Sequence, residues 1–205
     1  MFQSFFGDWS AIYRRFNLWS KKGIMIRLFN ALKKSSDLEW EFINGSFVKA
    51  HQHSAGASSD GSEAVGKSRG GNTTKIHLAV DSYGLPIEFK LTGGEVNDSI
   101  VAPDLIEQLP DSDYVAADKG YDSESIRELI RQKNATPVIP RKRNSKVGNS
   151  DIDWGFYKYR HLVENAFARL KHYRAIATRY DKLERNYAST VALGCCMIWL
   201  PMEVG

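Results

Sequence analysis

The sequence predicts an α/β fold in which a mixed β-sheet is flanked by helices. Strand-like segments come early in the chain, strands and helices then alternate, and a long amphipathic helix follows. An antiparallel meander followed by alternating strands and helices implies a mixed sheet covered by helices. The 205 residues, 42% of them hydrophobic, are enough for one substantial core.

The N-terminal part of the chain predicts helices and then a strand. Residues 1–35 carry aromatic and basic side chains at helical spacing, and we expect two short helices broken near Lys22-Gly23. Residues 36–205 would form the main domain. Its first strand lies within residues 38–51, which are rich in β-branched and aromatic side chains. Residues 53–71 are dense in Ser, Gly and Ala and predict a flexible loop.

An antiparallel hairpin with one buried face is predicted next. Apolar and polar residues alternate over residues 74–80 and again over 87–91, on either side of a turn at 81–86. The following Asn97-Asp98-Ser99 supplies candidate N-caps for a helix that ends near Leu109.

Strands and helices alternate in the second half. Residues 114–118 predict a short buried strand with Asp118 at its end, and a helix through Leu129 and Ile130 follows. A fifth strand is expected at 136–139. A basic loop then leads to the long helix, and the last apolar helix is expected from about Tyr187 to Leu200.

Four polar side chains share one stripe of the long helix. They are Tyr157, Arg160, Glu164 and Lys171, at offsets of 0, 3, 7 and 14. At about 100° per residue these offsets fall within roughly 60° of one another. The stripe borders the apolar face of the helix. A carboxylate between cations at the edge of a core suits metal-assisted chemistry on phosphates; the alternative is a solvated helix with chance ion pairs.

Charge, cysteines and hydropathy favour a protein that binds an anionic partner and argue against a disulfide-bonded, thiolate-metal or membrane protein. The net charge is +4 and the pI about 9.0, with cations concentrated in residues 141–146 and 160–185. This layout favours a surface that lies along phosphates over a merely solubilising one. The adjacent Cys195 and Cys196 make a structural disulfide or thiolate metal site implausible. Without a run of ~20 apolar residues or a signal peptide, we expect a soluble cytoplasmic protein that is not associated with a membrane.

Separate motifs resemble one known family in order and spacing. The element order is similar to the ribonuclease-H-like fold, and the motifs resemble DDE transposases of bacterial insertion sequences, in the insertion-sequence four and five superfamily. They are Val48-Lys-Ala-His-Gln-His53, Lys75-Ile-His-Leu-Ala-Val-Asp81, Ala117-Asp-Lys-Gly-Tyr121, and the spaced Tyr157, Arg160, Glu164 and Lys171. In that family, acids from the first strand, the fourth strand and a late helix form the active site. Asp118 and Glu164 match the second and third positions.

The resemblance implies in-line displacement at phosphorus with two Mg²⁺ or Mn²⁺ ions. These hard cations prefer carboxylate oxygens, so Asp118 and Glu164 would be the metal ligands. Tyr157, Arg160 and Lys171 would hold the phosphates of the DNA end. Further candidate DNA contacts are Lys49, Arg141, Lys142 and Arg143.

The first acid of the family pattern is missing. The pattern places an Asp before Gly/Ala-Ser/Thr, whereas this sequence has Asn44 before Gly45. Glu41 cannot replace it, because residues an odd number apart on a strand point to opposite faces. An amide oxygen can touch a metal but lacks the charge that holds two dications. We therefore expect Asn44 in the catalytic position of a transposase whose strand cleavage is crippled.

Partners follow from the same resemblance, which also implies a bacterial cytoplasm and association with the nucleoid. The partners are double-stranded DNA, as terminal inverted repeats and as target, and a second copy of the chain on that DNA. Family members usually carry more sequence ahead of the region matching residues 6–15, so residues 1–35 would be the remnant of a longer region, and the product of an upstream reading frame is a further candidate partner. Two alternatives remain: a catalytically inactive DNA-binding remnant, and a metal-dependent nuclease unrelated to mobility.

Overall fold

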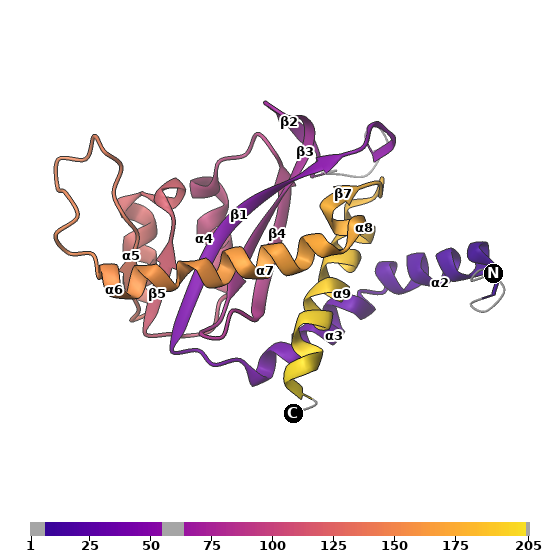
Figure 1. Cartoon of the computed structure of the whole chain (residues 1–205), viewed down its shortest axis with the longest axis horizontal. Helices are drawn as coiled ribbons and strands as arrows, with labels where there is room; N and C mark the ends of the chain where they lie inside the picture. Colours follow the sequence, from indigo (N-terminus) through magenta and orange to yellow (C-terminus); the bar gives the residue numbers. More distant parts are fainter. Residues whose placement is uncertain (1–6, 55–63, 204–205) are drawn as a thin grey trace.

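A mixed β-sheet forms the centre of the molecule (Figure 1). A computed structural model describes residues 7–54 and 64–203 of the chain. The strands are β1 (Trp40–Ala50), β2 (Gly66–Ser68), β3 (Gly71–Val80), β4 (Pro86–Gly93), β5 (Tyr114–Ala117), β6 (Thr136–Val138) and β7 (Thr178–Arg179). The helices are α2 (Trp9–Lys21), α3 (Ile24–Leu32), α4 (Asp98–Gln108), α5 (Glu124–Gln132), α6 (Trp154–Tyr157), α7 (His161–His172), α8 (Arg174–Ala177) and α9 (Glu184–Glu203).

The order of the strands confirms the predicted fold class. The five main strands lie in the order β4-β3-β1-β5-β6. The first three pair antiparallel, as in a meander, and β5 and β6 continue the sheet parallel to β1. This is the ribonuclease-H-like arrangement expected from the sequence. The short β2 and β7 pair with the ends of β3 and β1 and were not predicted.

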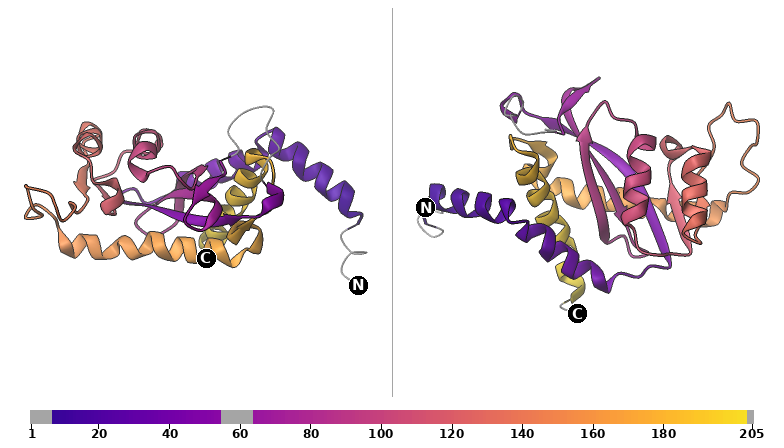
Figure 2. Two further views of the ribbon diagram at one scale, coloured as in Figure 1. Left: turned by 90° about the horizontal axis from the view of Figure 1, so that it is seen from above. Right: turned by 180° about the vertical axis from the view of Figure 1, so that it is seen from behind.

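Helices cover both faces of the sheet (Figure 2). The helix α7 crosses one face, and α4 and α5 cover the other. For this reason the prediction that the hairpin has a single buried face is wrong. Every residue of β3 from Thr73 to Val80 is buried, including Lys75 and His77, because α4 covers the side that was expected to face solvent.

The N-terminal helices break where the sequence predicted. Lys22 ends α2, and Gly23 adopts the left-handed conformation with φ of 64° before α3 begins. The helix α3 packs against α9 and buries Met25 and Phe29 in the common core. By contrast α2 extends away from the body (Figure 1). The division into residues 1–35 and 36–205 stays a prediction.

The remaining helices match the predicted positions, with two local differences. The stripe helix is divided: Tyr157 ends α6, residues Lys158–Arg160 form a 3-10 turn, and α7 continues from His161. Within the predicted loop 53–71, residues 55–63 lie outside the described residues, and the described remainder includes β2. Both cysteines are free and buried in α9. None of the helices in the described residues is long and apolar enough to cross a membrane.

Candidate active site

The pairing of β1 with β5 brings positions 44 and 118 together. The two strands run parallel, with Phe42 opposite Ala116 and Ile43 opposite Ala117. The next residue on each strand is Asn44 and Asp118. Side chains two residues apart share a face, and Phe42 stacks on Phe156 at a ring separation of 5.5 Å. Asn44 therefore faces the same side of the sheet as α6 and α7.

Local turns orient these two side chains. Asp118 ends β5, and its Oδ1 accepts a hydrogen bond of 2.7 Å from the Gly120 amide in the following 3-10 turn. Asn44 Oδ1 accepts one of 2.8 Å from the Gly45 amide. Both residues are half-buried. Each side chain keeps polar atoms available at the surface beside α7.

Glu164 lies near the start of α7 and is bound to Arg160. Arg160 Nη2 is 2.5 Å from Glu164 Oε1, in the i,i+4 geometry predicted by the stripe. The Glu164 side chain is 51% exposed. The Arg160 guanidinium also lies over the Tyr157 ring, 5.7 Å from its centroid. The structure therefore joins three of the four stripe residues in one contact group.

Tyr157 is half-buried, and its pKa differs from the ordinary value. Burial raises the pKa of Tyr157, the cation of Arg160 acts in the opposite direction, and the charges of Asp118 and Glu164 raise the pKa further. That Asp118 and Glu164 serve one site stays a prediction.

Lys171 marks the other end of the site. Its Nζ donates to Ser46 Oγ at 2.6 Å and to the Phe47 carbonyl at 3.1 Å. Burial lowers the pKa of Lys171. Ser46 is two residues from Asn44 on the same face of β1. The Lys171 end of the stripe therefore lies over β1 at Ser46, two residues beyond Asn44.

The other candidate DNA contacts lie away from the stripe. Lys142 and Arg143 are exposed in the loop before α6. Arg141 is buried: its guanidinium binds both carboxylate oxygens of Asp151, one of them at 2.8 Å, and the Gly148 carbonyl at 3.1 Å. Lys49 is exposed on the opposite face of β1 and lines an open hollow of about 580 Å³. The structure does not bring these cations to the Asp118–Glu164 group.

The donors of the site fit a hard cation in kind but fall short in charge. Asp118 and Glu164 offer carboxylate oxygens and Asn44 an amide oxygen, the donors that Mg²⁺ and Mn²⁺ accept. Across residues 7–54 and 64–203, no group of three or more His, Cys, Asp or Glu side chains is arranged to hold a metal ion. An acid at position 44 would add the third carboxylate. With Asn44 the site carries two negative charges, and Glu164 shares its charge with Arg160.

Sequence reasoning missed a second charged cluster on the other face of β1. Asp98, a candidate cap in the sequence, makes no capping bond; the cap position is Asn97. Instead Asp98 binds Lys75 and His77 of β3. The alternation of β3 placed Lys75 and His77 on one face, but it could not reveal that α4 would cover that face.

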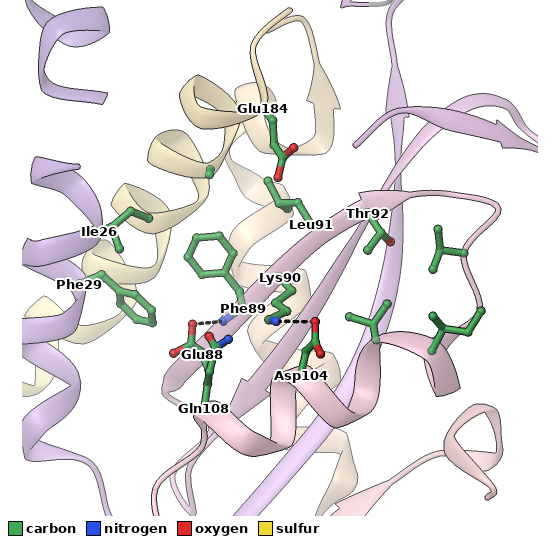
Figure 3. A pocket seen from close by; sticks show the side chains of 14 residues that line it. Ile26, Phe29, Glu88, Phe89, Lys90, Leu91, Thr92, Asp104, Gln108 and Glu184 are labelled. Atoms are coloured by element: carbon green, nitrogen blue, oxygen red, sulfur yellow. Dashed lines mark hydrogen bonds and ion pairs between the residues drawn. The ribbon is translucent and has the colours of Figure 1, made fainter. Parts of the chain in front are cut away.

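A hollow of about 590 Å³ lies along β4, away from Asn44 (Figure 3). Its charged side chains are bound within the protein. Lys90 reaches Asp104 of α4 at 3.1 Å, and Glu88 Oε1 accepts a hydrogen bond from the Phe89 amide. The β3 strand separates this hollow from β1. The candidate site is instead the open surface between the ends of β1 and β5 and α7.

Comparisons with known proteins agree on a family. Residues 42–200 match the family model described as "Transposase DDE domain". A Brucella ovis protein assigned as a transposase of insertion sequence element IS6501 is 37% identical over 128 residues, which is 62% of this chain and 98% of the relative. A Burkholderia cepacia protein assigned as a transposase of IS402 is 34% identical over 61% of this chain and 62% of its own length.

Solved structures give a more distant likeness. The catalytic core of BIV integrase is 15% identical, with a TM-score of 0.39 over 82% of this chain and 97% of that one. A Mos1 transposase paired-end complex with the left transposon end is 13% identical, with a TM-score of 0.35 over 88% of this chain and 59% of that one. At these scores the likeness supports no residue-level correspondence.

Proposed function

The chain belongs to the transposase family with a DDE domain, and from this premise we propose that it binds the ends of an insertion sequence through the α7 face of its sheet. Its DNA partner would be double-stranded and carry terminal inverted repeats. We propose that metal-dependent cleavage and transfer of DNA strands takes place on the same surface. Asn44 stands where this reaction needs a negatively charged carboxylate.

The observation that carries the proposal is the pairing of β1 with β5, which places position 44 next to Asp118 on the side of the sheet that α7 covers. Glu164 lies on α7 and is paired with Arg160. Arg160 contacts both Tyr157 and Glu164. Two acids beside a cation and a phenol form a surface that can hold a divalent ion and the phosphate next to it.

The residues divide into metal ligands and phosphate contacts. Asp118 and Glu164 would hold a divalent ion, which when bound activates the attacking oxygen and stabilises the leaving one. Arg160 and Lys171 would bind phosphate oxygens by charge-assisted hydrogen bonds, and Tyr157 would donate its hydroxyl. Binding a metal requires Glu164 to release Arg160, which would then be free for phosphate.

Outlying cations extend the proposed contact. Lys142 and Arg143 are exposed in the loop before α6, at that end of the stripe. We propose these two as further phosphate contacts of the α7 face, and Lys49, which is exposed on the opposite face of β1, as a contact to DNA outside that face. Arg141 is left out of this set because Asp151 occupies its guanidinium.

The neutral side chain at position 44 favours a second reading, in which the protein occupies element ends without cutting them. Asn44 lies beside Asp118 but adds no charge, and Glu164 is paired with Arg160. Under this reading the phosphate contacts persist while the metal-dependent step is lost. The protein would then compete with an intact transposase for the same ends.

Binding and cleavage of oligonucleotide duplexes test these proposals together. The probes are the two ends of the element that encodes the chain and a scrambled duplex of equal length, with Mg²⁺ or Mn²⁺ present. We expect the native protein to bind the ends in preference to the scrambled duplex and to cut neither. Asn44→Asp should cut the ends, whereas Asn30→Asp, which adds the same charge on the exposed part of α3, should not.

Other outcomes would contradict specific parts. Native protein that cuts the ends as fast as Asn44→Asp would remove the role given to position 44. Equal binding to ends and scrambled DNA would contradict end recognition, and hydrolysis of both duplexes alike would favour a nuclease unrelated to mobility. An Asn44→Asp protein that binds ends and leaves them intact would favour the inactive DNA-binding remnant.

A further inference from the structure

A buried charged cluster lies on the face of β1 opposite the candidate site. Asp98 begins α4, and its Oδ1 is 2.9 Å from Lys75 Nζ and 3.3 Å from His77 Nδ1. His77 is fully buried and its Nε2 is 2.9 Å from Thr92 Oγ1. Lys75 is also buried. The proposed chemistry uses none of these side chains, although burying charges is costly unless they are paired.

Two glycines leave room for the Asp98 carboxylate beside the backbone, one in the middle of β1 and one in the turn after β5. A Cβ added to Gly45 would lie 2.5 Å from Asp98 Oδ1 and 3.0 Å from Lys75 Cε. A Cβ added to Gly120 would lie 3.1 Å from Asp98 Oδ2. Gly45 directly follows Asn44, and the Gly120 amide donates to Asp118. One carboxylate thus touches both segments that carry the site.

The Asp98 carboxylate is paired with side chains on the α4 side of the sheet. Burial raises the pKa of Asp98, but hydrogen bonds and charges from His77 and Lys75 outweigh burial, so its pKa lies below the usual value. The ionised carboxylate is bound by those two side chains. Asp98 is therefore no substitute for the acid missing at position 44, which faces α7.

Tyr121 closes the cluster on the side of β5. It is almost completely buried, and its pKa is raised by burial first and then by the charges of Asp98 and Asp118. Tyr121 belongs to the same 3-10 turn as Gly120. The turn after Asp118 therefore lies close to Asp98 at Gly120, and Tyr121 of the same turn is buried.

We propose that Asp98 is a positioning residue that fixes the Asn44-Gly45 and Asp118-Gly120 segments side by side. Asp98 acts from the face of the sheet opposite the candidate site, through the backbone at Gly45 and Gly120, and it contacts neither metal nor DNA. The proposal rests on the proposed function, because the spacing of positions 44 and 118 matters only if they serve one reaction. Misplacing reacting groups by about 1 Å costs on the order of 10²-fold in rate.

The test uses the full chain carrying Asn44→Asp, with Asp98→Asn as the variant and Glu88→Gln as the matched control. Glu88 is also paired to a lysine of another element, Lys33 at 2.7 Å, and its side chain is 15% exposed, against 19% for Asp98. We expect Asp98→Asn to lower the single-turnover cleavage rate at saturating protein at least 30-fold, while DNA affinity stays within about twofold. Glu88→Gln should change neither quantity by more than about twofold.

Amide hydrogen exchange in the absence of DNA provides a readout that does not depend on cleavage. Asp98→Asn should accelerate exchange over residues 44–46 and 118–121, and Glu88→Gln should not. If the Asn44→Asp protein cuts no DNA, the proposed function fails, and the exchange result alone still decides whether Asp98 fixes the two segments. If Asp98→Asn does not fold, Gly45→Ala, which displaces Asp98 by one methyl group, is measured in the same two ways.

The proposal is overturned if exchange in both segments is unchanged. It is also overturned if the cleavage rate falls equally in Glu88→Gln, because the loss would then reflect general stability. A fall in DNA affinity that matches the fall in rate would assign Asp98 to binding and likewise contradict a positioning role.

Discussion

Two acids on the same side of the sheet, the fully buried Glu41 and the partly buried Asp98, are in opposite electrostatic states. Both lie on the side of α4 and α5, away from α7. Burial raises the pKa of Glu41 to about 8, and both of its carboxylate oxygens lack a hydrogen bond among the described residues. Asp98 is bound by Lys75 and His77, and its pKa lies below the usual value. Pairing, and not burial alone, decides whether a buried acid in this sheet carries charge.

The comparison extends to the α7 face, where the chemistry is proposed. Glu164 is half-exposed and paired with one cation of its own helix. Such a pair contributes little to folding and can exchange partners, whereas in the pair of Lys75 with Asp98 the lysine is buried and the acid is 19% exposed. The strand β1 therefore lies between two groups of charges. Asp98 with Lys75 and His77 is on one face, and the more exposed pair of Glu164 with Arg160 is on the other.

The largest expected effect concerns the unpaired acid. Glu41 has a folded pKa of about 8 against 4.5 for the ordinary group, so the folded state holds its proton more tightly than the unfolded state. Its contribution to stability is complete below pH 4.5 and is lost as pH rises to about 8, by at most ~5 kcal/mol. Glu41→Gln should remove this dependence and raise the unfolding free energy at pH 8.5.

Urea unfolding of both proteins between pH 5 and 9 measures this effect. The difference between native protein and Glu41→Gln isolates the titration of Glu41 from that of other groups. A difference that does not change with pH would show that Glu41 finds a compensating partner, and its contrast with Asp98 would disappear.

A smaller effect is expected from breaking the paired acid. Lys75→Met leaves the Asp98 charge with His77 alone and should lower the unfolding free energy by about 3 kcal/mol. The matched control is Lys33→Met, which removes the more exposed lysine of the pair with Glu88 and should cost about 1 kcal/mol. Urea unfolding at pH 7 measures both, and equal costs would show that the burial of Lys75 adds nothing to its pair with Asp98.

The smallest effect on folding is expected on the α7 face. Arg160→Gln should change the unfolding free energy by less than about 0.5 kcal/mol, since its pair with Glu164 is an exposed i,i+4 pair. It should nevertheless weaken binding to DNA ends about tenfold and reduce the slope of log affinity against log salt by about 1. Arg169→Gln, an exposed change on α7 outside the stripe, is the control in fluorescence anisotropy titrations. Equal weakening by both variants would show that α7 binds DNA only through its overall charge.

The sequence predicted the main strands and the polar stripe of the long helix from local periodicity, and the ribonuclease-H-like fold from the order of the elements and the family resemblance. Alternation over residues 74–80 and the 3.6-residue spacing from Tyr157 to Lys171 are properties of neighbouring residues. The position of Asn44 beside Asp118 was predicted from family resemblance, and the register of β1 with β5 agrees with it.

Tertiary contacts that leave no local pattern could not be predicted. The burial of Lys75 and His77 depends on α4, whose first residue comes more than 20 positions later. Arg141 looked like part of a basic loop, but its carboxylate partner Asp151 is ten residues away and is brought back by the loop itself. The Asp98 cluster joins α4 to β3, and Asp98 also lies close to Gly45 and Gly120, so it depends on contacts between segments far apart in the sequence.

The charge at position 44 is the central claim, and a Mn²⁺ titration of the DNA-bound protein tests it most directly. Calorimetry on complexes with one element end compares native protein with Asn44→Asp, and Asn30→Asp serves as the charge control. A third carboxylate beside Asp118 and Glu164 should tighten Mn²⁺ binding at least about tenfold, with no change in the control. Equal Mn²⁺ affinity of the native and Asn44→Asp complexes would contradict the account.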